Sequence, residues 1–194
     1  VFGTLPHRAD SDPAMVLAIQ NFKGGVGKST MVCHFAQHLA LRGYRVCVVD
    51  CDSQASTTSV FGLNPDGDVD EEEDALYPII RHGGPPPALG MVSLSVLRAA
   101  DALVIPAPPN NIDFGSTAHF LKMLGATLNE LARHGGTRDY AFVKILATKM
   151  NDSKSAHMAI KRMMDAVFPL DMLQSVLKDS AEIDNAAANL STVY

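Results

Sequence analysis

The stretch NFKGGVGKST, from Asn21 to Thr30, decides how the rest of this 194-residue chain is interpreted. Its glycines allow the backbone to curl so that consecutive N–H groups point inward, a geometry that a Cβ atom would obstruct. Such a cradle binds phosphate oxygens, with Lys28 reaching the β and γ phosphates and the Ser29 hydroxyl holding Mg²⁺. Nucleotide contacts are therefore predicted for Gly24, Gly25, Val26, Gly27, Lys28, Ser29 and Thr30.

The sequence on either side of this loop places it between a strand and a helix. Met15 to Ile19 (MVLAI) is a short apolar run, as expected for a buried parallel strand. After the loop, apolar residues recur at helical spacing and Gly43 follows as a helix stop. These helical positions are Val32, Phe35, Ala36, Leu39 and Ala40. The order of strand, glycine loop and helix puts the positive end of the helix dipole under the phosphates, which argues against an accidental glycine turn.

Lys23, a second lysine at the start of the loop, narrows the type of phosphate-binding site. The ordinary pattern requires glycine where Phe22 stands, so the strict pattern fails. The variant xKGGxGK[ST], matched from Lys23 to Ser29, resembles the deviant Walker A motif of the ParA and MinD superfamily of ATPases. That resemblance implies that Lys23 crosses to a partner subunit and contacts its nucleotide, so that ATP holds two subunits face to face.

A second apolar run ends in two acidic residues. Arg45 to Asp50 (RVCVVD) predicts a strand, after which Asp50 and Asp52 would lie at the carboxyl edge of the sheet, where a doubly wound fold builds its site. The segment resembles the DxDxQ motif of the same superfamily, with Ser53 where proline is usual. The resemblance implies that Asp52 aligns the attacking water and that Asp50 lies in the outer coordination sphere of Mg²⁺. An acidic helix cap or turn is the alternative interpretation.

The middle of the chain departs from the superfamily pattern. In the ATPases that the chain resembles, PPALG follows an apolar strand that ends in a Walker B aspartate. Here Gly84 stands at the aspartate position, and no apolar strand precedes it. Either the protein lacks this strand and its acid, or a segment between residues 84 and 85 is missing from the sequence. We expect the second, because deleting a central strand would leave a parallel sheet with unpaired backbone groups; the Walker B acid therefore has no residue number here.

The remaining sequence alternates between strand and helix patterns. Strands are predicted at Ala102–Ile105, Tyr140–Thr148 and Met172–Leu177, and helices at Ser93–Ala100, Asp113–Arg133 and around the apolar stripe from Ala156 to Val167. Alternation of this kind predicts an α/β fold with a doubly wound, mostly parallel sheet and helices on both faces. Residues 1–13 have no periodic pattern and are predicted to be a linker, and residues 14–194 to be one phosphate-loop ATPase domain.

Asn151 follows the predicted strand at Tyr140–Thr148, in the loop ATKMND. It is a candidate for contacting the adenine ring of a nucleotide. A structural part in the turn is the alternative, because asparagine side chains often bond their own backbone.

Composition limits the class of protein. With 47% hydrophobic residues the chain can bury a sizeable core, and no segment approaches the ~20 apolar residues that span a bilayer, so we expect a soluble domain. Three cysteines, an odd number with no signal peptide before them, favour a reducing cytoplasm over a disulfide framework. A formal net charge of -5 excludes nucleic-acid binding by bulk charge and leaves a local basic patch open.

The order of the motifs is most similar to the plasmid-partition ParA branch of the superfamily, especially the RepA proteins of alphaproteobacterial replicons. The resemblance spans Met15 to about Tyr194 and rests on NFKGGVGKST, DCDSQAS, PPPALG, DFGST and LKDSAEIDNAA. It implies ATP/ADP and Mg²⁺ as cofactors, weak ATP hydrolysis, and a homodimer in the ATP state. Implied partners are non-specific DNA of the bacterial nucleoid and a ParB-type centromere-binding protein that stimulates turnover. An N-terminal helix-turn-helix domain and a final C-terminal helix are also implied beyond these residues.

Three other functions stay open at this point. A non-hydrolysing nucleotide-binding scaffold fits a chain without a Walker B acid. A MinD-like positioning ATPase would act at membranes through a C-terminal amphipathic helix, which the tail AANLSTVY does not show, so no membrane partner is expected. A nucleic-acid-binding module would need an exposed basic face. Few residues support that face: Lys154, Lys161, Arg162 and Lys178.

Overall fold

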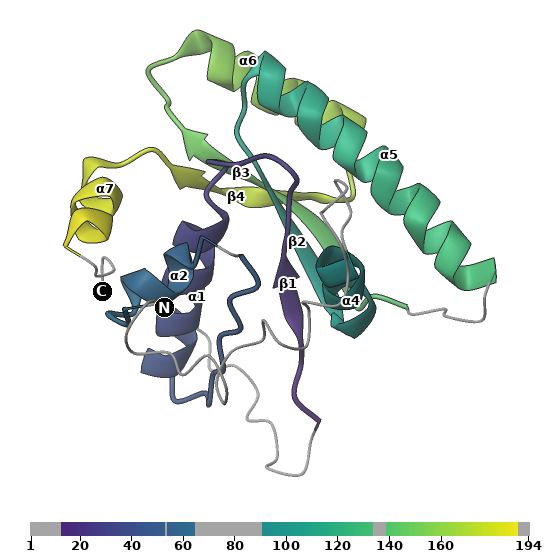
Figure 1. Ribbon diagram of the computed structural model, residues 1–194. Helices are drawn as coiled ribbons and strands as arrows, with labels where there is room; N and C mark the ends of the chain where they lie inside the picture. Colours follow the sequence, from purple (N-terminus) through teal and green to yellow (C-terminus); the bar gives the residue numbers. More distant parts are fainter. Residues whose placement is uncertain (1–12, 53, 65–90, 134–138, 190–194) are drawn as a thin grey trace.

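The computed structural model describes residues 13–52, 54–64, 91–133 and 139–189. At its centre is a four-stranded parallel sheet with the strand order β1-β2-β3-β4 (Figure 1). The strands are β1 (Leu17–Ile19), β2 (Ala102–Ala107), β3 (Phe142–Met150) and β4 (Met172–Lys178). All six residues of β2 are buried, as a continuous apolar strand inside a parallel sheet should be.

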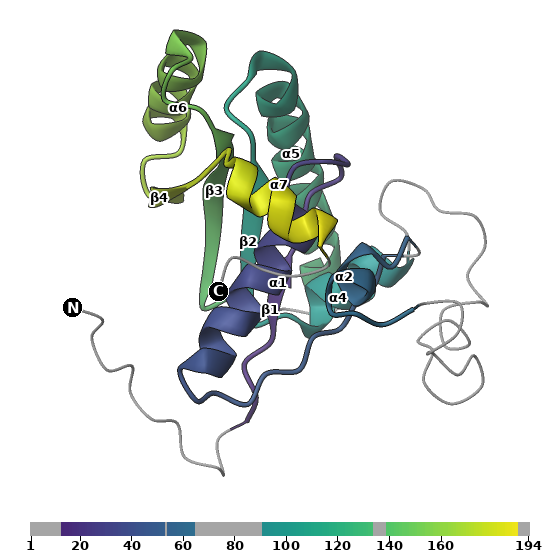
Figure 2. The same ribbon diagram turned by 90° about the vertical axis from the view of Figure 1, so that its left-hand side faces the viewer.

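Helices cover both faces of the sheet. They are α1 (Lys28–Leu41), α2 (Ser56–Val60), α4 (Met91–Ala99), α5 (Asn111–Arg133), α6 (Ser155–Val167) and α7 (Ala181–Ala188). The two views show α1, α2 and α7 on one side of the sheet and α5 and α6 on the other (Figures 1 and 2). The predicted α/β fold with a doubly wound parallel sheet is confirmed.

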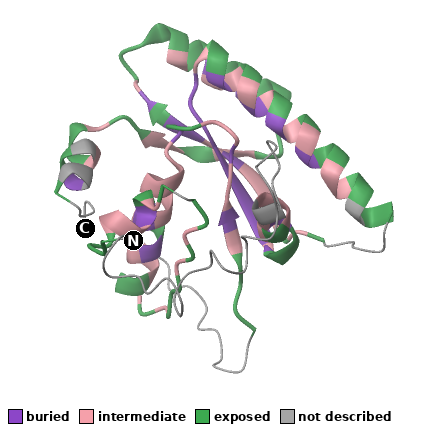
Figure 3. Ribbon diagram, in the orientation of Figure 1, coloured by how far each residue is buried: buried purple, intermediate pink, exposed green. Residues whose placement is uncertain are grey.

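The main core lies between the sheet and the α5 and α6 side, where buried residues meet in the middle of the layers (Figure 3). Leu103 and Ile105 of β2 point into this core, which also contains Phe120 of α5 and Met164 of α6. Phe22, which stands where an ordinary phosphate loop has glycine, packs edge-on against Phe120 with ring centroids 4.6 Å apart. The residue that broke the strict loop pattern therefore anchors the loop to the core.

Most predicted elements are confirmed, with shifts at their ends. The strand that begins the chain's core starts at Leu17, two residues later than predicted, and the long helix starts at Asn111, two residues earlier than predicted. The strand predicted at Tyr140–Thr148 occurs as β3, shifted by two residues. The predictions for residues 1–12, for Ser53 and for the Gly84–Pro85 junction lie outside the described residues.

The strand predicted at Arg45–Asp50 is wrong, because residues 44–52 form neither helix nor strand. Val49 is 60% exposed and Val46 is 39% exposed. A strand needs a neighbour for its backbone hydrogen bonds, and in the described ranges the sheet ends at β1, which pairs with β2. The apolar pattern of this segment was thus insufficient without a pairing partner.

Candidate functional site

The glycine loop between β1 and α1 has the backbone that the sequence predicts. Gly25 has φ +73° and Gly27 has φ +96°, in the left-handed region that favours glycine. A Cβ atom built on Gly27 would lie 3.8 Å from the Cβ atom of Thr148, so the backbone conformation rather than lack of space requires glycine there. Since α1 begins at Lys28, the first N–H groups of this helix, which have no acceptor within it, follow the loop directly.

Thr148 fastens the far side of the loop to the sheet. This residue of β3 is fully buried, and its hydroxyl donates a hydrogen bond to the carbonyl oxygen of Val26 at 2.7 Å. Val26 itself is 1% exposed. The loop is therefore held against the carboxyl end of β3.

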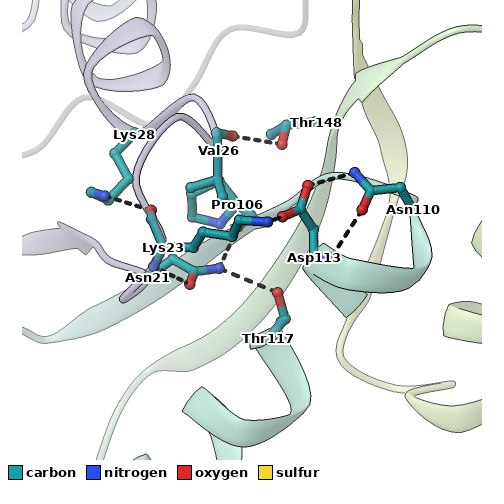
Figure 4. A network of polar contacts seen from close by, with 9 residues as sticks. All are labelled: Asn21, Lys23, Val26, Lys28, Pro106, Asn110, Asp113, Thr117 and Thr148. Atoms are coloured by element: carbon teal, nitrogen blue, oxygen red, sulfur yellow. Dashed lines mark hydrogen bonds and ion pairs between the residues drawn. The ribbon is translucent and has the colours of Figure 1, made fainter. Parts of the chain in front are cut away.

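Asn21 fastens the near side of the loop, and it is 4% exposed. Its Nδ2 donates to the carbonyl oxygen of Pro106 in β2 at 2.8 Å and to Thr117 Oγ1 in α5 at 3.3 Å. Its Oδ1 accepts a hydrogen bond from the Lys23 backbone N–H at 3.1 Å (Figure 4). One buried side chain thus links the loop to a strand and to a helix on the other face of the sheet.

Lys28 folds back over its own loop. Its Nζ donates to the Lys23 carbonyl oxygen at 3.0 Å. Burial lowers the pKa of Lys28 from its ordinary value, and the negative charge of Asp52 opposes that shift by raising the pKa. A partly desolvated cation above a cradle of N–H groups is suited to bind an anion, and Asp52 is close enough to affect the pKa of this lysine.

Lys23 forms an ion pair with Asp113 Oδ1 in the first turn of α5 (Figure 4). Asp113 is 9% exposed. Its backbone N–H donates to Asn110 Oδ1 at 2.9 Å, and Asn110 Nδ2 donates to the other carboxylate oxygen. Asn110 and Asp113 therefore satisfy each other at the start of α5, in the manner of a capping box.

Asp50 and Asp52 make only local hydrogen bonds among those described. Asp50 Oδ2 accepts from the backbone N–H groups of Thr57 at 3.1 Å and Thr58 at 3.0 Å, and from Thr58 Oγ1 at 3.1 Å. Asp52 Oδ1 accepts from the backbone N–H of Gln54 at 3.1 Å. Asp50 thus caps the N-terminus of α2, whose N-cap residue, Ala55, has no polar side chain.

Asp50 also affects a residue of α1, because its negative charge contributes to the pKa of the Cys33 thiol. Burial raises the pKa of the Cys33 thiol to about 11, and the negative charge of Asp50 adds to that shift. The same two causes raise the pKa of Cys51. The acidic segment therefore lies near α1, with Asp52 acting on the pKa of Lys28 and Asp50 acting on that of Cys33.

Asn151 follows β3 and lies three residues beyond Thr148. Its Oδ1 accepts a hydrogen bond from the Ser153 backbone N–H at 3.0 Å, and its own N–H contacts His157 Nδ1 at 3.3 Å. The structure thus gives Asn151 a part in the turn, one of the two interpretations that the sequence left open, and its contact with adenine stays a prediction.

Sequence reasoning missed Asp113, Asn110 and Thr148 as site residues. The spacing of Asn110 and Asp113 at the start of a helix was a capping signal that could have been recognised. Thr148, a polar residue at the end of the strand predicted at Tyr140–Thr148, was a second signal, because site residues lie at the carboxyl ends of parallel strands. The partnership of Asp113 with Lys23 has no sequence signal, since 90 residues separate them.

Membrane-spanning helices and metal-binding clusters of side chains are both absent from the described ranges. No helix in them is long and apolar enough to cross a membrane. No three side chains of histidine, cysteine, aspartate or glutamate gather there to hold a metal ion.

Comparison with known proteins gives the following matches. The family model "CobQ/CobB/MinD/ParA nucleotide binding domain" matches residues 17–193. A protein of Rhizobium rhizogenes named "Putative replication protein A" is 25% identical over 257 residues, covering 98% of this chain and 64% of its own length. Protein SopA of Escherichia coli K12 is 24% identical over 260 residues, covering 100% of this chain and 66% of its own length. The chain thus spans less than two thirds of the length of these relatives.

Solved structures share the fold. An ATP complex of McdA from Cyanothece has a TM-score of 0.72 at 16% identity and covers 92% of this chain and 88% of its own. The pNOB8 ParA bound to nonspecific DNA has a TM-score of 0.62 at 18% identity and covers 88% of each chain.

Proposed function

This chain belongs to the CobQ/CobB/MinD/ParA nucleotide-binding domain family, and we propose that it is a partition ATPase that dimerises with ATP and segregates plasmid or chromosomal DNA. The observation that carries this proposal is the glycine loop with two lysines, fastened to the sheet by Asn21 and Thr148. Relatives named for replication and for chromosome partitioning support the biological part of the proposal.

The loop residues bind the phosphates of ATP. Backbone N–H groups of Gly24, Gly25, Val26 and Gly27 and of the first residues of α1, including Thr30, surround the β and γ oxygens. Lys28 exchanges its hydrogen bond to the Lys23 carbonyl oxygen for a phosphate oxygen. Because Asn21 and Thr148 already hold the loop, little of its backbone has to become ordered when the nucleotide binds. Asn151 contacts adenine through Nδ2, since its Oδ1 is engaged by Ser153.

Ser29 and Asp50 have the oxygen ligands that suit Mg²⁺, which commonly takes one or two protein oxygens together with substrate phosphates. Ser29 would hold it through the hydroxyl in the first turn of α1. Asp50 would act from the outer coordination sphere through Oδ1, which accepts one hydrogen bond from the Asp52 backbone N–H, whereas Oδ2 accepts three. When bound, Mg²⁺ neutralises charge that develops on the β and γ oxygens.

Hydrolysis needs a residue that orients water, and we assign this to Asp52. One of its carboxylate oxygens bonds Gln54, and the carboxylate lies near enough to Lys28 to affect its pKa. Lys23 of a neighbouring copy stabilises charge in the transition state as an electrostatic finger. In the ATP state two copies face each other, and hydrolysis lets them separate.

A non-hydrolysing nucleotide-binding scaffold is the second candidate function. It is favoured by the exposed segment around Asp50 and Asp52, which lies outside the sheet and is held by local hydrogen bonds. The scaffold predicts ATP-dependent dimers without phosphate release. Measurement of phosphate release therefore separates the two candidates.

We also propose the partners of the dimer. These are non-specific DNA of the bacterial nucleoid and a ParB-type centromere-binding protein that accelerates hydrolysis. Support comes from the nucleic acid in the pNOB8 ParA structure and from the partition proteins among the relatives. With a net charge of -5, binding to DNA requires a local basic surface, so it should weaken steeply with added salt.

A further part of the proposal concerns the missing Walker B strand. The alignment with SopA runs over 260 residues and covers all of this 194-residue chain, so SopA carries extra residues inside the matched region. We propose that a segment between Gly84 and Pro85 supplies the strand and the acid in the natural protein. The intact mass of the natural protein tests this: a value that matches 20.7 kDa, the mass of this sequence, would contradict it.

The main experiment measures the molar mass in solution with ATP and with ADP, for the wild-type chain and Lys23→Ala. We expect a doubled mass with ATP for wild type alone, while monomeric Lys23→Ala still binds the nucleotide. Lys28→Ala is the comparison variant, in which nucleotide binding itself is lost. Equal dimer formation by wild type and Lys23→Ala would rule out a dimer bridged by Lys23.

A further inference from the structure

The amine of Lys23 is already occupied within its own chain. It pairs with Asp113, and the side chains are 35% and 12% exposed, respectively. The proposed function assigns this same amine to the nucleotide of a second copy. Both interactions use one ammonium group, and the aspartate and the phosphates lie on different molecules.

Asp113 is the fixed member of this pair. Asn110 contacts the Asp113 carboxylate through Nδ2 and its backbone N–H through Oδ1. The carboxylate also lies in the first turn of α5, where the helix dipole favours negative charge. Asp113 therefore stays in place when the ion pair opens, and the movement belongs to Lys23.

Only the side chain of Lys23 is free to move, because its backbone is held on both sides. Asn21 accepts a hydrogen bond from its N–H, and Lys28 donates one to its carbonyl oxygen. A lysine side chain on a fixed backbone can swing between two anions without rearrangement of the loop. When phosphates attract Lys28, its amine leaves the carbonyl oxygen of Lys23. Nucleotide binding at Lys28 therefore changes a hydrogen bond of the Lys23 backbone.

We infer that Asp113 is an intramolecular counter-ion that withholds Lys23 from a second copy, so that ATP-dependent dimerisation must replace this carboxylate with the partner's nucleotide. This inference rests on the proposed function. A binding-competent state that is only fractionally populated weakens apparent affinity by that fraction. In a two-fold symmetric dimer, Lys23 of each copy gives up Asp113 for the nucleotide of the other copy. If each ion pair weakens association about threefold, the two together raise the dimer dissociation constant about ninefold.

The test uses Asp113→Asn, which removes the charge and leaves an amide able to bond Asn110. Sedimentation with ATP should give a dimer dissociation constant about tenfold lower than that of wild type. In the nucleotide-free monomer, acetic anhydride should modify Lys23 a few times faster in Asp113→Asn, as measured by mass spectrometry of the peptide that contains Lys23. Asp165→Asn is the matched control, since it removes the carboxylate of the ion pair with Lys161 on α6 and should leave both measurements unchanged.

Each outcome decides the inference. An unchanged or weaker dimer in Asp113→Asn overturns it, and so does an unchanged modification rate of Lys23. If wild type does not dimerise with ATP, the proposed function fails, while the modification rate still reports whether Asp113 shields Lys23. Asp113→Ala, which removes the carboxylate altogether, should shift both measurements in the same direction, and it replaces Asp113→Asn if that variant does not fold.

Discussion

The two sides of the phosphate loop differ in how they are held. On one side Asn21 and Thr148, both buried, attach the loop to β2, β3 and α5. On the other side Asp50 and Asp52 lie on an exposed segment, and their hydrogen bonds reach residues of α2 or the same turn. One half of the site is thus supported by the core, and the other half is supported only by its own neighbours.

This difference separates binding from hydrolysis. The groups that bind phosphate are positioned by side chains whose loss would leave buried polar atoms without partners, which costs about 1–3 kcal/mol each. Asp52 and Asp50, the two acids assigned to water and to Mg²⁺, have no comparable support in the described part of the chain. A mutation on the first side should therefore affect folding, and a mutation on the second side should affect turnover.

The largest expected effect is on the exposed side. Asp52→Ala should lower ATP turnover about 10²-fold, because the water loses the group that orients it. The same change should alter the free energy of unfolding by less than about 0.5 kcal/mol, since the residue is exposed. Phosphate release and chemical denaturation measure the two quantities. Retained turnover would show that Asp52 does not orient the attacking water. The dimer formed with ATP should persist in the Asp52→Ala variant.

Asn21→Ala should give the largest loss of stability on the buried side. It removes three hydrogen bonds and leaves Pro106 O and Thr117 without their partner, so unfolding should be easier by about 2 kcal/mol. Asn151→Ala is the control, because that asparagine accepts one local bond and should cost less than about 1 kcal/mol. Similar losses of unfolding free energy in the two variants, measured by urea denaturation, would show that Asn21 supports the fold no more than a residue with one local bond.

Thr148→Val keeps the shape of the side chain and removes the hydrogen bond to Val26 O. We expect a loss of about 1.5 kcal/mol, since Val26 O is left buried without that donor. ATP binding should weaken as well, because the loop is less well held. Thr58→Val makes the matching change on the acidic segment, where Asp50 keeps two backbone donors, and should cost about 0.5 kcal/mol. A larger loss of stability in Thr58→Val than in Thr148→Val would contradict the conclusion that the core supports only one side of the loop.

The smallest effect is a pH dependence at the boundary of the two sides. Burial and Asp50 raise the pKa of Cys33 from 9.0 to about 11 in the folded protein. The folded state therefore keeps its thiol proton longer than the unfolded state, so the stability from Cys33 is full below pH 9.0 and is lost as pH rises toward 11. At pH 10 the loss should be about 1 kcal/mol. Cys33→Ala should flatten this part of the stability profile, and an unchanged slope would show that Cys33 is not its source.

Local patterns predicted some features of the molecule correctly and one strand wrongly. The loop, its flanking strand and helix, and the parallel sheet were predicted from local patterns, because glycine geometry and apolar periodicity act over a few residues. The strand at Arg45–Asp50 had the same kind of pattern and failed, since pairing depends on a neighbour that the pattern does not contain. The capping function of Asp50 was recognised as an alternative because it, too, is local.

The sequence by itself determined where phosphate would bind, since the conformation of Gly25 and Gly27 and the start of α1 follow from residues adjacent in the chain. The tertiary structure alone decided what surrounds that loop. It joined Thr148 to Val26 across 122 residues and Lys23 to Asp113 at the start of α5. Backbone conformation is governed by local sterics, whereas the partner of a buried polar group or a charge is whichever group the packing of strands and helices brings within reach.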